Sequence, residues 1–414
     1  MLFLTAALVA LLPVSLAAPF AEPESLPVAK RAPLHSARSG KAIPGKYIVK
    51  FKDGASSGTV LSSATVGNLK LNSSQIFKGP FKGFAGSLDA ASLEAIRKLA
   101  EVEFVEEDAV ITLADDFTVP GTSTGTAPRA IISQTGAPWN LARLSNSPSV
   151  ITPSNVYRYD NSAGIGTCSY VIATGIHVSH IQFGGRAVWG ANFADSSNSD
   201  GNGHGTNIAG IIGSTTYGVA KKTVLIAVKV LNASGSGTTS GVIQGINFVA
   251  TDSATRSCPG GVVASFTVGG ASSTALNNAV QNLVMQNVFV AVSAGTSGVP
   301  ISSSPQSAPL ACTVGSTTVG NACFANTDYG PLLDIWAPGQ NILTTTPGGT
   351  ATLTSASFGA AHVAGLGAYL LGLPSALTGS GMCSYMQSIA IPNILTGCPP
   401  NTVNLLAYNG WDLP

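Results

Sequence analysis

Short apolar segments with strand character alternate with segments of helical periodicity through the second, larger part of this chain. Strand-like runs fall at 169–172, 224–230, 261–266 and 288–292, and helical runs at 241–250 and 276–285. This alternation predicts βαβ units, in which parallel strands share one sheet and helices cover both of its faces. The expected fold class is therefore α/β with a mostly parallel central sheet.

The composition fits a globular scaffold of this kind and argues against several other classes of protein. Charged residues make up 9% of the chain and the formal net charge is +1, which leaves no basic surface for a nucleic acid and no polybasic patch for a membrane. The chain has 414 residues, more than the roughly 250–300 that one core usually holds. We expect two folded units in a monomer that binds neither nucleic acid nor membrane.

The N-terminal segments indicate a secreted precursor. Residues 1–17 are almost entirely apolar and are followed by small residues and a proline, which is typical of a secretory signal peptide and predicts an extracellular protein. Residues 18–45 are rich in proline, alanine and basic side chains without periodicity, so a flexible leader is expected there. The leader contains a dibasic pair, Lys30-Arg31, that a processing protease could cut.

A small α+β unit is expected at 46–114. Its sequence has strand-like runs at 47–51 and 103–111 and a segment of helical spacing at 93–99. It precedes a linker at 115–130 that is rich in glycine, threonine and proline. The unit therefore forms a separate domain in front of the larger one.

The cysteine content favours disulfides. An even number of cysteines behind a signal peptide is typical of a disulfide framework, and the absence of a Cys-x-x-Cys pair or a His/Cys cluster argues against a zinc site. Six cysteines allow fifteen pairings, and their spacing does not choose among them. They are Cys168, Cys258, Cys312, Cys323, Cys383 and Cys398.

Four segments resemble the catalytic motifs of the proteinase K subfamily of subtilisin-like serine proteases. Residues 203–206 are similar to the histidine motif, and residues 355–365 to the segment that carries the nucleophilic serine. Residues 170–175 resemble the strand end that reads Asp-Thr-Gly in the family, and residues 293–296 resemble the oxyanion segment. The similarity extends over residues 131–414 and implies a subtilisin-like three-layer fold.

Two of these segments keep their catalytic residue and two do not. The resemblance places His204 at the general-base position and Ser357 at the nucleophile position. Ala173 stands at the position of the triad aspartate, where a methyl group can neither orient the imidazole nor stabilise its positive charge. Thr296 stands at the oxyanion asparagine and has a shorter, β-branched side chain.

No obvious carboxylate replaces the missing one. The sequence between Asp160 and Asp195 contains no acidic residue, and a more distant acid would have to reach hydrogen-bond geometry with the imidazole. The resemblance also extends to the first domain, which is similar to the inhibitor propeptide of these proteases. It implies that the tail of residues 46–114 enters the active-site cleft and that Arg129 marks the propeptide junction.

Further features follow from the resemblance. It implies the pairs Cys168–Cys258 and Cys312–Cys383, which leaves Cys323 and Cys398 for a third bridge. It also implies a structural calcium site formed by the Asp334 carboxylate with backbone oxygens near Pro309 and Ala311, and hard oxygen ligands of this kind suit Ca²⁺. The substrate-binding residues that it implies are Gly235, Ser236, Gly237, Ser265, Thr267 and Gly269.

Two sequons, at Asn72 and Asn232, predict N-glycosylation of a secreted protein. Since Asn232 precedes the substrate-aligning segment, a glycan there could hinder peptide entry. The principal hypothesis is a secreted pseudoprotease that binds peptides, protease inhibitors or its own propeptide. The alternatives are a slow serine endopeptidase acting through Ser357 and His204, and a structural or adhesive protein without a peptide-binding cleft.

Overall fold

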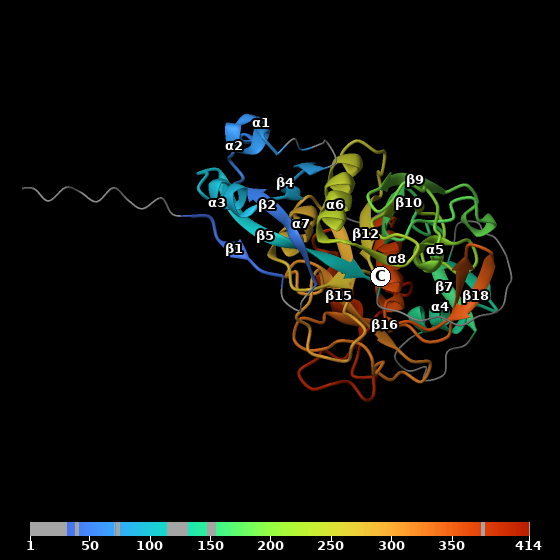
Figure 1. Cartoon of the computed structure of the whole chain (residues 1–414). Coiled ribbons are helices and arrows are strands. Elements are labelled where there is room, and N and C mark those ends of the chain that lie inside the picture. Colours follow the sequence, from blue (N-terminus) through green and yellow to red (C-terminus); the bar gives the residue numbers. More distant parts are fainter. Residues whose placement is uncertain are drawn as a thin grey trace, which may run out of the picture.

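The computed structural model describes residues 31–37, 41–69, 71, 75–113, 131–146, 155–373 and 377–413 (Figure 1). The predicted signal peptide at 1–17, the sequon at Asn72 and the linker at 115–130 lie outside the described residues. Within the described part, no helix has the length and apolar character needed to cross a membrane.

The first domain is a small α+β unit, as the sequence predicts, with a sheet that is antiparallel except for one short edge strand. The strands lie in the order β1-β5-β2-β4-β3, and their inner faces pack on one apolar cluster that includes Val49, Phe84, Ile96 and Val105. The elements are β1 (Leu34–His35), β2 (Ala42–Phe51), α1 (Ser57–Ser62), α2 (Ala64–Gly67), β3 (Ile76–Lys78), β4 (Lys82–Ser87), α3 (Ala90–Arg97) and β5 (Val102–Thr112).

Part of the segment expected to be a flexible leader, 18–45, contributes to this domain. β1 pairs with β5 in parallel, so that Leu34 lies opposite Val105, and β2 already begins at Ala42. Ala32 is buried in the core of this domain. A strand of two residues is too short to show a periodicity of two, which is why the sequence pattern does not reveal it.

The second domain is built on a nine-stranded sheet with the order β19-β20-β16-β15-β14-β12-β8-β10-β9. All neighbouring strands are parallel except β19 and β20. The strands are β8 (Thr167–Ala173), β9 (Ala187–Asn192), β10 (Val224–Lys229), β12 (Gly261–Phe266), β14 (Val288–Ser293), β15 (Cys312–Thr317), β16 (Ile335–Pro338), β19 (Ile391–Pro392) and β20 (Leu405–Leu406).

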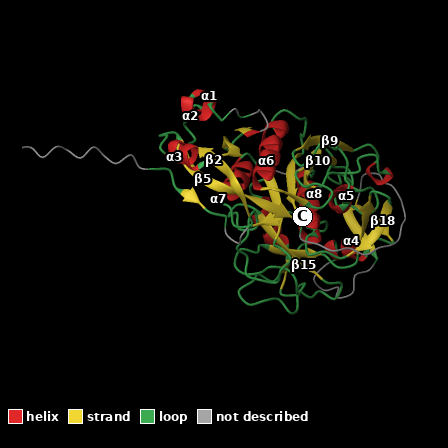
Figure 2. Cartoon of the chain, in the orientation of Figure 1, coloured by secondary structure: helices red, strands yellow, loops and turns green. Residues whose placement is uncertain are grey.

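Helices cover both faces of this sheet (Figure 2), and the central strand β8 shows why. Its side chains alternate: Val171 and Ala173 pack in the cluster with α5 and α8, whereas Tyr170 and Ile172 pack in the cluster with α6 and α7. A strand buried on both faces is apolar throughout. The helices are α4 (Trp139–Leu144), α5 (His204–Gly213), α6 (Thr239–Ser253), α7 (Thr274–Met285), α8 (Phe358–Leu371) and α9 (Met382–Ile389).

The remaining elements are short, and disulfides tie the domain together. Two-stranded sheets are formed by β6 (Ile131–Thr135) with β7 (Val156–Asp160) and by β17 (Ile342–Thr346) with β18 (Gly349–Leu353), and η2 (Ile181–Phe183) is a single 3₁₀ turn. The bridges are Cys168–Cys258, Cys312–Cys383 and Cys323–Cys398. The expected pairings are confirmed, including the third.

Candidate active site

The candidate site lies at the carboxyl edge of the parallel sheet. β8, β10, β12 and β14 end side by side there, because Ala173 lies opposite Lys229 and the neighbouring Ile172 lies opposite Phe266. Phe266 in turn lies opposite Val292. Ligand sites of α/β proteins form at this edge. The structure thus brings Ala173 and the segments that follow β12 and β14 to one place.

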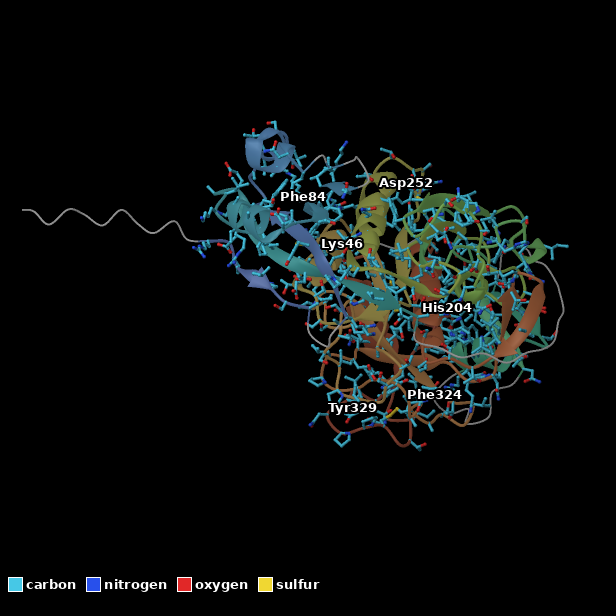
Figure 3. The ribbon with its side chains drawn as sticks, viewed as in Figure 1. Lys46, Phe84, His204, Asp252, Phe324 and Tyr329 are labelled. Atoms are coloured by element: carbon cyan, nitrogen blue, oxygen red, sulfur yellow. A yellow bond between two sulfur atoms is a disulfide. The ribbon has the colours of Figure 1, made fainter. Side chains whose placement is uncertain are left out.

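His204 is the first residue of α5, and glycines make its position possible. Gly203 precedes it with a φ of 101°, a left-handed conformation that favours glycine. A Cβ at Gly205 would lie 1.9 Å from the carbonyl oxygen of Gly175, so no side chain fits there. This close approach places α5 directly against the end of β8, with the imidazole fully buried near the centre of the molecule (Figure 3).

The imidazole of His204 lies within hydrogen-bond distance of a threonine. Its Nε2 lies 2.9 Å from Thr267 Oγ1, and Thr267 directly follows β12. Burial lowers the pKa of His204 to about 4, although the nearby charge of Asp200 opposes this shift. The ring is therefore neutral at pH 7 and is a weaker base than an ordinary histidine.

Asp200 is the acid whose charge acts on His204, but its oxygens are committed to the turn before α5. Oδ1 accepts hydrogen bonds from Thr174 Oγ1 and from the Gly203 N–H, both at 2.8 Å. Oδ2 accepts hydrogen bonds from the Thr206 N–H at 2.9 Å and from its hydroxyl at 2.5 Å. These bonds shape the turn and engage both carboxylate oxygens of Asp200.

Ala173 is fully buried, and its surroundings are apolar. Its methyl group belongs to the cluster that also contains Val171 and Ile208. The polar groups next to it belong to the following residue: the Thr174 hydroxyl accepts a hydrogen bond from the Gly205 N–H at 2.9 Å. The position that the sequence resemblance assigns to the triad carboxylate is therefore filled by a methyl group.

Ser357 directly precedes α8, as the sequence predicts for the nucleophile position. Its side chain is buried, and its Oγ has no hydrogen-bond partner among the described residues. The backbone around it is well held: the Ser357 N–H donates to Ser355 Oγ at 2.9 Å, and the Ala356 carbonyl accepts from Ser316 Oγ at 2.9 Å. The serine is thus held in place without a base on its hydroxyl.

Thr296 follows Gly295 at the end of β14 and is partly exposed. It lines a pocket of about 340 Å³ together with Gly269, Gly270 and Leu113. Since Leu113 belongs to the first domain, the end of the first domain forms part of the wall of this pocket. The Thr296 hydroxyl is the only side-chain group that this position offers to a developing oxyanion.

The tail of the first domain lies against the second domain as an extended strand, β5 (Figure 1). β5 pairs antiparallel with β11 (Ser236–Thr238) on one side and with β13 (Gly269–Gly270) on the other. Thr112 lies opposite both Ser236 and Gly269, and the Leu113 N–H donates to the Gly235 carbonyl at 2.8 Å. This is recognition by β-strand addition, in which main-chain hydrogen bonds hold the peptide.

The expected substrate-binding residues therefore separate into two groups. Gly235, Ser236, Gly237 and Gly269 contact or pair with the tail. Ser265 is buried inside β12 and is not among the residues that line this pocket. Thr267, also expected to bind substrate, instead contacts His204.

Two acids of β5 hold the first domain on the second, and sequence reasoning missed them. Asp108 accepts hydrogen bonds from the Ser240 N–H at 3.1 Å and its hydroxyl at 2.6 Å, in the first turn of α6. Glu106 accepts hydrogen bonds from the Ser273 hydroxyl and from the Ala275 N–H, the latter at 3.1 Å, at the start of α7. Helix N-termini favour negative charge. Burial nevertheless raises the pKa of both carboxyls.

Comparison with known proteins decides the family. A model of the subtilase family matches residues 170–394, and a model of the peptidase inhibitor I9 family matches residues 46–114. This chain belongs to the subtilase family. The subtilase is 46% identical over 407 residues to the subtilisin-like serine protease AsES of Sarocladium strictum, covering 97% of each chain. It is 44% identical over 383 residues to proteinase R of Parengyodontium album, covering 92% of each.

A solved structure supports the same assignment. The crystal structure of a cold adapted subtilisin-like serine proteinase is 37% identical to the subtilase, with a TM-score of 0.62, and the match covers 66% of this chain and 99% of that one. The chain therefore has the subtilisin-like α/β fold, preceded by an I9-type propeptide. Its relatives are proteinase K-like fungal proteases.

Of the residues expected to hold calcium, Asp334 offers a carboxylate whose two oxygens have different contacts. The Asp334 Oδ2 accepts a hydrogen bond from the Thr313 N–H at 2.8 Å, and its Oδ1 has only a longer contact with Gln387 Nε2, at 3.4 Å. Burial raises the pKa of this carboxyl to about 6. The nearby sulfurs of Cys312 and Cys383 form a disulfide and are not ligands.

Proposed function

We propose that this subtilase is a secreted pseudoprotease that binds peptides, and its own propeptide, in an intact cleft but hydrolyses them poorly. The observation that carries the proposal is the buried methyl group of Ala173 at the end of β8. The neutral ring of His204, with its Nε2 on Thr267, agrees with it. Peptide-bond hydrolysis needs a nucleophile, a base, an orienting carboxylate and an oxyanion donor in one arrangement.

The expected loss of activity is large. In subtilisin, removing the triad carboxylate alone costs a factor of about 3 × 10⁴ in kcat. Removing the oxyanion asparagine costs a factor of about 10² to 10³. Effects of residues that act as a unit do not add, so the combined loss is not the product of the two factors. Either one alone reduces this chain to a very slow enzyme.

The second candidate function is a slow serine endopeptidase that acts through Ser357 and His204. The retention of both residues favours it. A purely structural or adhesive role is disfavoured, because the pairing of β5 with β11 and β13 shows a cleft that accepts an extended peptide.

Self-processing distinguishes the first two functions. The full chain is expressed with its signal peptide in a host lacking secreted proteases, and the intact mass of the product is measured over time. We expect the native chain to keep residues 46–129, whereas the double variant Ala173→Asp with Thr296→Asn cuts itself. The control is Ser357→Ala in the double variant, which must stop the cutting. Serine-dependent self-cleavage of the native chain would instead establish the slow protease.

Two further features belong to this proposal. Asp334, with the backbone oxygens of Pro309 and Ala311, would hold one structural calcium ion, which supplies charge neutralisation for a buried carboxylate. Asn72 and Asn232 would carry glycans. The Asn232 side-chain oxygen accepts hydrogen bonds from the N–H groups of Ser234 and Ser236 at 3.0 and 3.1 Å, and these bonds leave its nitrogen as the attachment atom.

A further inference from the structure

The pocket beside the cleft has a polar floor. It holds about 340 Å³, opens next to Leu113 of the bound tail, and has Gly269, Gly270 and Thr296 in its walls. Ser303, Gln306 and Asp328 also line it. A side chain of a peptide that lies along β13 can enter this space, so the chemistry of the floor decides which side chain is favoured.

Asp328 places a desolvated carboxylate in this pocket. Its residue is 6% exposed, and its Oδ1 accepts hydrogen bonds from the N–H groups of Ser297 and Val299 at 2.8 and 3.1 Å. Its Oδ2 lies directly against the Gly295 backbone, where an added Cβ would come within 2.2 Å of it. The described residues include no ion pair to Asp328. A buried carboxylate of this kind gains from a cationic ligand.

Gln306 adds a second acceptor. It is 3% exposed, and its Nε2 donates to the Val268 carbonyl at 3.2 Å. This bond fixes the amide under Gly269, where an added Cβ would meet Nε2 at 2.7 Å. The Gln306 Oε1 has no hydrogen-bond partner among the described residues. An unsatisfied buried acceptor calls for a donor from a ligand.

The charged residues around the pocket also favour a cationic ligand. Among the residues that line it, Asp328 is the only acid and Lys41 the only base. Lys41 belongs to the first domain and is exposed. The bound propeptide therefore supplies one positive charge near the pocket, and without the propeptide the lining carries only the negative charge of Asp328.

We propose that this pocket selects an arginine or lysine side chain of a bound peptide, with Asp328 and Gln306 as the residues that determine the preference. The proposal rests on the peptide-binding function proposed above and names the class of peptide. A guanidinium or ammonium group would donate to both acceptors, whereas an apolar side chain would leave the Asp328 carboxylate without a cationic partner and the Gln306 Oε1 without a donor.

The test uses two small probes that differ in charge and donors and fit a pocket of this size. Binding of benzamidine, a cation, and of benzamide, its neutral analogue, to the full chain is measured by isothermal titration calorimetry. We expect benzamidine to bind at least about tenfold more tightly than benzamide, as hydrogen bonds to charged groups imply. Equal binding, or no binding of benzamidine, would overturn the proposal.

Variants assign the preference to its residues. Asp328→Asn keeps an oxygen for the Ser297 and Val299 N–H groups while removing the charge, so the loop is expected to stay folded and the preference for benzamidine to disappear. Gln306→Met is expected to weaken benzamidine binding about fivefold or more. The matched control is Asp53→Asn, which removes a charge from a side chain that is 87% exposed and must leave the preference unchanged. An undiminished preference in Asp328→Asn, with a native circular dichroism spectrum, would contradict the assignment.

This outcome is independent of catalysis. Serine-dependent self-cleavage of the native chain would refute the pseudoprotease function and leave the preference for benzamidine intact. Absence of a preference for benzamidine over benzamide would refute the proposed specificity of the pocket. It would not contradict the pseudoprotease function.

Discussion

The cleft that binds the propeptide and the catalytic centre that would cut it lie at the same edge of one sheet. They differ in the kind of contact that forms them. The seat, which is the surface that binds the propeptide, consists mainly of backbone pairing of β5 with β11 and β13, and the carboxylates of Asp108 and Glu106 add hydrogen bonds to it. The centre depends on side chains, and in the proposed assignment two of its four key positions hold alanine and threonine. Strand pairing tolerates changes of side chain, whereas proton transfer does not. Peptide recognition can therefore outlast hydrolysis.

The strongest test of this comparison restores the catalytic centre one residue at a time. Ala173→Asp is expected to raise the rate of self-cleavage by about 10⁴, and Thr296→Asn alone by about 10² or less, because the carboxylate loss is the larger of the two in subtilisin. Rates come from the intact mass of the full chain over time. If Thr296→Asn alone restored most of the activity, Ala173 would not be the decisive change.

The ionisation of His204 gives the next largest effect. Its pKa of about 4 is depressed, so the folded state binds fewer protons than the unfolded state between pH 4 and the ordinary value near 6.5. Stability contributed by neutral His204 is therefore present above pH 6.5 and is lost as the pH falls toward 4. Ala173→Asp is expected to raise the pKa by about 1–3 units through an adjacent negative charge, as followed by NMR titration. An unchanged titration would show that residue 173 does not face the ring.

Binding of the propeptide to the seat can be weakened without changing any residue of the catalytic centre. Asp108→Ala removes the acceptor of the Ser240 N–H and hydroxyl and is expected to cost about 2 kcal/mol of docking, since hydrogen bonds to charged groups are worth about 1.5–3 kcal/mol. Hydrogen exchange of the β5 amides should speed up about 30-fold, while Asp53→Ala serves as the exposed control. Unchanged protection in Asp108→Ala would mean that strand pairing alone holds the tail.

The seat should also respond to pH. Docking raises the pKa of Glu106 and Asp108, so the docked state holds their protons more tightly than the free state. Docking is therefore expected to weaken as the pH rises from about 4 through the raised pKa values, and to level off above them. Hydrogen exchange of β5 at several pH values, corrected for the intrinsic rate, measures this trend; docking that strengthens over this range would contradict it.

The smallest expected effect concerns calcium. If Asp334 holds Ca²⁺, free calcium at about ten times its dissociation constant adds about 1.4 kcal/mol of stability, which raises the Tm by about 3–5 °C in a domain of this size. The measurement is thermal unfolding with calcium and with a chelator, compared with Asp334→Asn. An equal calcium effect in the variant would place the ion elsewhere.

The sequence predicted those features of the fold and of the site that depend on local residue patterns. The apolar alternation around β8 and β12 gave the parallel sheet, and the segments that contain His204 and Ser357 carried enough family pattern to place both residues. The structure was needed for contacts between distant residues. The Thr267 contact with His204 joins positions 63 residues apart, and the Asp108 bond to Ser240 spans 132 residues. Neither pair leaves a periodic or local signal.

The central claim is that the serine at position 357 is in place but not activated. The most direct measurement is the rate at which a fluorophosphonate probe labels the secreted full chain, alongside Ser357→Ala and the double variant Ala173→Asp with Thr296→Asn. We predict no labelling of the native chain above the Ser357→Ala background and rapid labelling of the double variant. Labelling of the native chain that disappears in Ser357→Ala, at a rate near that of the double variant, would contradict the claim.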